Sequence, residues 1–143
     1  MSAGAVLKLM KEKEIEYVDL RFTDPRGKLQ HLTMDGKVVD EEMLNVGVYF
    51  DGSSIAGWKA INESDMILKP DLERQVVDPF TSHNTLILFC DILDAVKKDP
   101  YERDPRSTAK KAEAYLKKSG IGDKANFGPE AEFFVFDDVR YKN

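Results

Sequence analysis

The sequence predicts an α+β fold, in which a small, mostly antiparallel or mixed sheet packs on short helices. Apolar runs of strand type follow one another up to about Leu93, and they leave little room for the helical crossovers that parallel strands need. Helical spacing of apolar residues is confined to a few short segments. With 42% hydrophobic residues among 143, the chain is long enough to bury one core.

The first third of the chain predicts a helix, a hairpin and a helical turn. Apolar residues recur at helical spacing over residues 3–13, and Ser2 is available as the N-cap. Two strand-like runs, 15–22 and 29–34, are separated by Asp24-Pro25-Arg26-Gly27, which is typical of a tight turn. A brief helical turn is expected over residues 38–45.

Four further strands are expected before residue 93, and a polar, glycine-bearing loop follows the first of them. The strands are predicted over residues 48–50, 66–69, 75–77 and 85–92, and the loop over residues 51–58. The single cysteine, Cys90, lies inside an apolar run, which predicts a buried free thiol.

A change in composition predicts a domain boundary near residue 100. Residues 94–106 are charged and contain prolines, as is typical of a connection between packed units. Beyond them we expect a helix that Ser107 caps and that runs to about Lys118, then a strand over residues 126–136. One helix and one strand cannot close a core, so we expect residues 1–100 to form a domain and 101–143 to be the start of an incomplete one.

Charge and hydropathy exclude several classes of partner. The chain has 21 basic and 26 acidic residues and a net charge of -5, which disfavours a nucleic-acid partner. Its longest apolar run, residues 86–90, is far too short to span a membrane, and the N-terminus lacks a signal-peptide pattern. We therefore expect a cytoplasmic protein without a membrane partner.

Two carboxylates in the expected strand at 126–136 are candidate metal ligands. Because side chains alternate along a strand, Glu130 and Glu132 share a face with Phe134 and Phe136. Carboxylates that continue an apolar row need arginines, solvent or divalent cations beside them. Glu-x-Glu alone is a weak motif, and solvated surface acids are the alternative.

The loop over residues 51–58 is the second candidate site. Asp51, Ser53 and Ser54 are short polar residues suited to a small polar pocket, in which Asp51 acts as a base or binds a small cation. A capped turn without a binding role is the alternative, with Trp58 as a packing aromatic. His31 and His83 lack partners at metal-ligand spacing in the sequence and are expected to be structural or exposed.

Taken together, these segments resemble glutamine synthetases of the bacterial type I class. The motifs that carry the resemblance cover essentially the whole chain: Tyr17-Val18-Asp19-Leu20-Arg21-Phe22-Thr23-Asp24, Phe50-Asp51-Gly52-Ser53-Ser54, Glu63-Ser64-Asp65, Tyr101-Glu102-Arg103-Asp104-Pro105-Arg106 and Phe127-Gly128-Pro129-Glu130-Ala131-Glu132-Phe133-Phe134. The second and third of these together are similar to the N-terminal signature of the family.

The resemblance implies a β-grasp-like N-terminal domain followed by the first helix and strand of a truncated catalytic domain. It also implies an ATP-dependent ligase that joins ammonium to glutamate through a γ-glutamyl phosphate. Asp51 resembles the residue that receives ammonium and removes its proton, and Ser54 a partner in that pocket. Glu130 and Glu132 resemble ligands of two divalent cations, Mg²⁺ or Mn²⁺.

The resemblance also implies an assembly of identical subunits, in which two stacked hexameric rings form a dodecamer. The loop at Asp51 is lent to the neighbouring subunit, and Trp58 is expected to pack at that contact. The remaining metal ligands and the ATP- and glutamate-binding motifs of the family are not among these 143 residues, so we expect this chain alone to be inactive. The alternative is a non-catalytic β-grasp module that serves binding or assembly.

Overall fold

The structure is a computed structural model that describes residues 1–58 and 64–142. Its elements in chain order are α1 (Ala3–Glu12), β1 (Tyr17–Thr23), β2 (Leu29–Asp35), η1 (Gly36–Val38), α2 (Glu41–Val46), β3 (Val48–Asp51), η2 (Gly52–Ser54), β4 (Asp65–Val77), β5 (Thr85–Asp94) and α3 (Pro105–Ser119). None of the helices in these described ranges is long and apolar enough to cross a membrane.

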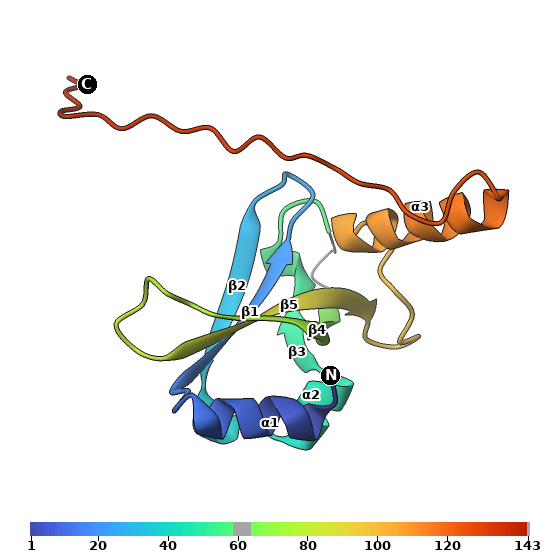
Figure 1. Cartoon of the computed structure of the whole chain (residues 1–143), viewed down its shortest axis with the longest axis horizontal. Helices are drawn as coiled ribbons and strands as arrows, with labels where there is room; N and C mark the ends of the chain where they lie inside the picture. Colours follow the sequence, from blue (N-terminus) through green and yellow to red (C-terminus); the bar gives the residue numbers. More distant parts are fainter. Residues whose placement is uncertain (59–63, 143) are drawn as a thin grey trace.

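The five strands form one sheet in the order β2-β1-β5-β4-β3. Strand β1 pairs with β5 in parallel, and the other neighbours are antiparallel, so the predicted α+β fold with a mixed sheet is confirmed. The sheet is curled, and α1 and α2 lie together along one side of it, whereas α3 lies at the other end (Figure 1).

The core lies where alternate strand residues meet the two N-terminal helices. Strand β1 contributes Val18 and Leu20, and β5 contributes Leu86 and Leu88, each with no more than a trace of exposed surface. The sulfur-bearing side chain of Cys90 follows in the same row, so the predicted buried thiol is confirmed, and burial raises its pKa.

The predicted hairpin is present, and a buried aspartate fixes its turn. The carboxylate of Asp24 accepts hydrogen bonds from the backbone N–H groups of Arg26 and Lys28, both at 2.9 Å, and from the side chain of Gln30. Gly27 adopts the left-handed conformation that completes the turn.

One predicted boundary between strands was wrong. The strands expected at 66–69 and 75–77 are one strand, β4, with a shift of register between Pro70 and Gln75. Strand β3 pairs with β4 only as far as Leu68, so Pro70 lies where one edge of β4 has no strand neighbour among the described residues.

The cap predicted for the last helix was also wrong. Asp104, rather than Ser107, caps α3, because its carboxylate accepts from the N–H groups of Arg106 and Ser107, at 3.1 and 3.0 Å, and Pro105 occupies the first turn. The side chain of Ser107 donates to the same carboxylate at 2.8 Å.

The strand expected over residues 126–136 is absent. A strand needs a neighbour to pair with its backbone, and no described strand lies beside this segment, which extends away from the sheet (Figure 1). Its apolar side chains are exposed, among them Phe133 at 83% and Phe134 at 85%. The rings of Phe134 and Phe136 still stack, with centroids 6.0 Å apart.

Candidate active-site loop

The best-defined polar site is the loop that follows β3. Asp51 is the last residue of β3 and pairs with Asp65 of β4. The backbone N–H of Gly52 then donates to the carbonyl of Ser64 at 2.6 Å. A Cβ atom at residue 52 would collide with the side chain of Met66 and lie 2.9 Å from the Ser64 carbonyl oxygen, so the tight approach requires glycine.

The carboxylate of Asp51 organises the turn behind it. Its Oδ1 accepts from the backbone N–H of Ser53 at 2.8 Å and from the Ser53 hydroxyl at 2.6 Å. Its Oδ2 accepts from the hydroxyl of Ser54 at 3.2 Å. Asp51 thus caps the short helix η2, which agrees with the alternative of a capped turn. Its carboxylate also contacts Ser54, which agrees with the interpretation of a small polar pocket.

These hydrogen bonds keep Asp51 ionised. The Ser53 hydroxyl and then its backbone N–H lower the pKa of Asp51, slight burial opposes them, and Ser54 and Ser64 lower it further. Asp51 and Ser54 are both exposed, so the carboxylate can still be reached from solution. The group is therefore available to a small cationic ligand that can give up a proton.

Trp58 closes the loop against the core. Its side chain is 5% exposed, and its ring lies 5.6 Å from that of Phe22 and 6.1 Å from that of Phe50, measured between centroids. Trp58 therefore packs on this chain's own core, as the alternative of a packing aromatic requires. Its packing at a contact with a neighbouring subunit stays a prediction. Glu63, which belongs to the motif after the loop, lies outside the described residues.

The two glutamates proposed as metal ligands lie far along the chain from this loop. Glu130 and Glu132 are exposed in the extended segment, and the described residues contain no cluster of three or more His, Cys, Asp or Glu side chains that could hold a metal ion. Their carboxylate oxygens are of the type that Mg²⁺ and Mn²⁺ prefer. The donors are chemically suitable, but the described part of this chain supplies too few of them for a complete site.

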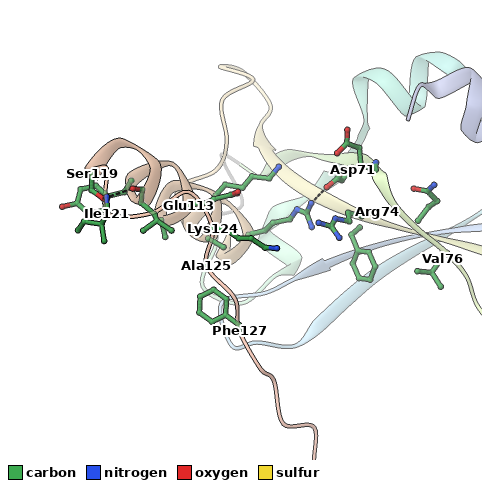
Figure 2. Close-up of a pocket in the computed structure, with 18 residues that line it drawn as sticks. Asp71, Arg74, Val76, Glu113, Ser119, Ile121, Lys124, Ala125 and Phe127 are labelled. Atoms are coloured by element: carbon green, nitrogen blue, oxygen red, sulfur yellow. Dashed lines mark hydrogen bonds and ion pairs between the residues drawn. The ribbon is translucent and has the colours of Figure 1, made fainter.

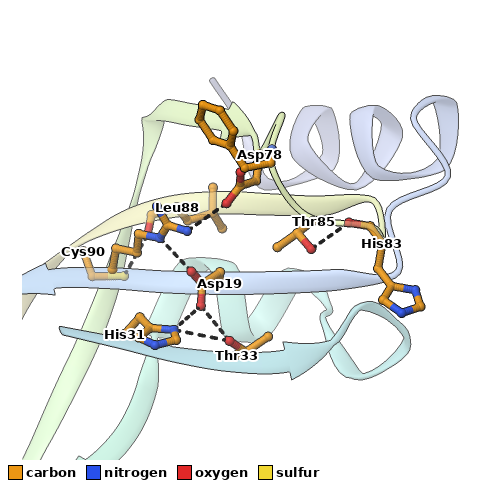
Figure 3. Close-up of polar contacts among 10 residues, drawn as sticks. Asp19, His31, Thr33, Asp78, His83, Thr85, Leu88 and Cys90 are labelled. Carbon is orange, nitrogen blue, oxygen red and sulfur yellow. Dashed lines mark hydrogen bonds and ion pairs between the residues drawn. The ribbon is translucent and has the colours of Figure 1, made fainter. Parts of the chain in front are cut away.

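A buried polar cluster on the outer face of β1 and β2 was not predicted. Asp19, 4% exposed, accepts from Arg21 at 2.6 Å, from the hydroxyl of Thr33 at 2.7 Å, and lies 2.9 Å from Nδ1 of His31 (Figure 3). Arg21 also donates to Asp78 at 3.0 Å. Alternation along β1 puts Asp19 and Arg21 on one face, which is the signal in the sequence, but only the strand register brings Thr33 and His31 opposite them.

Both histidines have acidic neighbours in space. His31 lies beside Asp19, and Nδ1 of His83 is 3.2 Å from the carboxylate of Glu16. Both imidazoles are mostly exposed, so the expectation that they are structural or exposed is confirmed.

A groove of about 1390 Å³ runs between α3, the outer side of β4 and the start of the extended segment (Figure 2). Arg106 ties α3 to the sheet here through ion pairs with Asp71 and, at 2.7 Å, Asp91. The groove is lined by mixed apolar and charged residues and includes none from the loop at Asp51. The groove is therefore separate from the candidate site at Asp51.

Comparisons with known proteins agree on one family. The family model "Glutamine synthetase, beta-Grasp domain" matches residues 14–95, and "Glutamine synthetase, catalytic domain" matches residues 102–143. The glutamine synthetase of Rhizobium meliloti is 66% identical over 141 residues, and that of Azorhizobium caulinodans is 60% identical over 141 residues. Each alignment covers 99% of this chain, which spans 30% of the length of these relatives.

A solved structure supports the same fold. The cryo-EM structure of Plasmodium falciparum glutamine synthetase superposes with a TM-score of 0.76 at 24% identity, and covers 84% of this chain and 23% of that one.

Asp19 makes the stability of the fold depend on pH. Burial would raise the pKa of Asp19, but the hydrogen bonds from Arg21, Thr33 and His31 lower it overall. Its stabilisation is complete above the pKa of the unfolded chain, about 4, and is lost as pH falls through the lower pKa of the folded state. We expect Asp19→Asn to reduce the free energy of unfolding at pH 7 by about 1–3 kcal/mol, measured by urea denaturation.

The same measurement at lower pH separates Asp19 from the other acids. The difference between wild type and Asp19→Asn should shrink as pH falls from 5 to 3, whereas the exposed Asp123→Asn should match wild type at every pH. A difference that is independent of pH would contradict the assignment.

Proposed function

Because the chain belongs to the glutamine synthetase family, we propose that it forms the N-terminal part of a synthetase subunit that makes glutamine from glutamate, ammonium and ATP. The observation that carries the proposal is the loop of Asp51 and Ser54, an exposed carboxylate held ionised beside hydroxyl groups. The two family matches fall on either side of residue 100, which supports a β-grasp domain over 1–100 and the start of a catalytic domain over 101–143.

The chemistry proceeds in two steps. The γ-carboxylate of glutamate attacks the terminal phosphorus of ATP, ADP leaves, and a γ-glutamyl phosphate results. Asp51 then accepts a proton from ammonium, and the ammonia formed attacks the acyl carbon and displaces phosphate. The low pKa of Asp51 favours binding of the cation, and Ser54 orients the carboxylate that receives it.

Glu130 and Glu132 would each supply one ligand to a divalent cation, Mg²⁺ or Mn²⁺. When bound, such cations neutralise the charge that develops on the phosphoryl oxygens. The other ligands would come from outside these 143 residues, and so would the sites for ATP and glutamate. The exposed phenylalanines that follow Glu132 support the packing of a further part of the enzyme on this segment.

The complete enzyme would work in the cytoplasm as an assembly of identical subunits, with a dodecamer of two hexameric rings as the expected form. The loop at Asp51 lies at the β3 edge of the sheet, which supports its use at a contact with a neighbouring subunit.

We predict that the 143-residue chain alone has no glutamine synthetase activity. A phosphate-release assay with glutamate, ammonium and ATP should read background, because most of the ligands that the reaction needs are proposed to lie elsewhere. Release of phosphate that depends on all three substrates would contradict this division of the active site.

Asp51 can be tested in a hybrid subunit, in which residues 1–143 replace the matching segment of the Rhizobium meliloti relative. We expect Asp51→Asn to lower kcat by about 100-fold or more, since the amide cannot take a proton from ammonium. Asp99→Asn, a change at an exposed acid in another loop, is the matched control and should leave kcat within twofold. Full activity of Asp51→Asn would exclude the assigned role.

The metal assignment is tested in the same hybrid. Glu130→Ala and Glu132→Ala should each raise the Mg²⁺ or Mn²⁺ concentration needed for half-maximal activity by about 10-fold or more. Glu73→Ala, which removes an exposed carboxylate on β4, is the control. An unchanged metal dependence in both variants would mean that these glutamates are solvated surface acids.

A further inference from the structure

Two side chains from the segment before α3 hold the far end of the loop that carries Asp51. The hydroxyl of Tyr101 donates to the carbonyl oxygen of Trp58 at 3.0 Å in a buried position. Arg103 donates through Nη1 to the carbonyl oxygens of Gly57, at 3.1 Å, and Trp58, at 3.4 Å. We call these contacts of Tyr101 and Arg103 the loop anchor.

The loop anchor is itself fixed to the centre of the sheet. Tyr101 is 8% exposed, its backbone N–H donates to the carbonyl of Ile92 in β5 at 2.8 Å, and its ring packs on Trp58 with centroids 5.7 Å apart. The carbonyl of Tyr101 also accepts from the N–H of Asp104, the cap of α3, at 3.2 Å. The start of α3 and the end of the loop are therefore attached to β5 at one residue.

The loop depends on these contacts for its position. Its near end is held by strand pairing and by the hydrogen bond from Gly52 to Ser64. At its far end the indole Nε1 of Trp58 is buried and finds no acceptor in the described part of the chain, so its own hydrogen bond does not fix the ring. The position of this end therefore depends on packing and on the carbonyl groups of Gly57 and Trp58. The contact at the Trp58 carbonyl is buried, and a buried carbonyl requires a donor.

We infer that Tyr101 and Arg103 are positioning residues for Asp51, through which the segment leading into α3 sets the geometry of the ammonium pocket. This inference rests on the proposed function of Asp51. The carboxylate accepts hydrogen bonds from Ser53 and Ser54, which belong to the loop itself, and from Ser64, just before β4. A loop released at Trp58 carries the hydroxyls of Ser53 and Ser54 away from their places. Asp51 is then held only by β3 and by Ser64.

The first test follows the loop directly in the 143-residue chain. The variant Tyr101→Phe/Arg103→Met keeps both side chains close to their original size and removes every donor of the loop anchor. We expect amide hydrogen exchange of residues 52–58 to accelerate about 10-fold or more, while that of β1 and β5 stays within twofold. Emission from Trp58, the single tryptophan of the chain, should change with it.

A matched control separates the anchor from general effects of the substitutions. Tyr115→Phe/Arg74→Met makes the same chemical changes at two exposed residues beside the groove of α3, and loop exchange should equal that of wild type. Equal acceleration in both double variants, or none in the anchor variant, would overturn the loop anchor.

The second test asks whether the anchor acts on ammonium. In the hybrid subunit, the anchor variant should raise the KM for ammonium about 5-fold or more and leave the KM values for glutamate and ATP within twofold. An equal rise in all three KM values, or no change in any, would overturn the positioning role. A failure of the proposed function is distinguishable, because Asp51→Asn would then retain full activity whatever the exchange of the loop.

Discussion

The parallel pairing of β1 with β5 is the contact on which the rest of the structure depends. It joins strands separated by more than sixty residues and sets Val18 beside Leu86 and Leu20 beside Leu88, so one continuous apolar row faces α1 and α2. The same register leaves Asp19 and Arg21 on the opposite face, where Arg21 reaches Asp78 just beyond β4. The carbonyl of Ile92 in β5 accepts from the backbone N–H of Tyr101, and the hydroxyl of Tyr101 in turn donates to Trp58 at the end of the candidate loop.

Asp51 is held by two kinds of constraint that come from different parts of the chain. The close approach of Gly52 to Ser64 and Met66 ties the near end of the loop to β4, because a Cβ atom at residue 52 would collide with the side chain of Met66 and the carbonyl oxygen of Ser64. Hydrogen bonds from Tyr101 and Arg103 tie its far end to the segment before α3. The carboxylate thus lies at the edge of the sheet, open to a ligand, while the backbone around it is fixed by the interior.

Patterns within short stretches of sequence predicted most of the fold. They failed where the structure depends on residues that are distant in the sequence. Asp24, Pro25 and Gly27 identify the hairpin because the turn is built from neighbours in sequence, and Asp51 with its serines predicts the polar loop for the same reason. The cluster at Asp19 depends on register, which no local pattern gives. The prediction of a strand at 126–136 was wrong because alternating side chains show only which residues would share a face. A strand also needs a neighbouring strand to pair with its backbone.

The contrast between two aspartates indicates why Asp51 is the candidate for chemistry. Both have a lowered pKa and both are ionised at neutral pH. Asp19 is ionised because it accepts hydrogen bonds from several neighbours, among them the guanidinium of Arg21. Its side chain is only 4% exposed and is therefore closed to a ligand from solution. Asp51 is ionised beside uncharged donors, the serines Ser53, Ser54 and Ser64, and stays exposed, so its negative charge is not already neutralised. A carboxylate in that condition attracts a cation from solution, which is the first requirement for receiving ammonium.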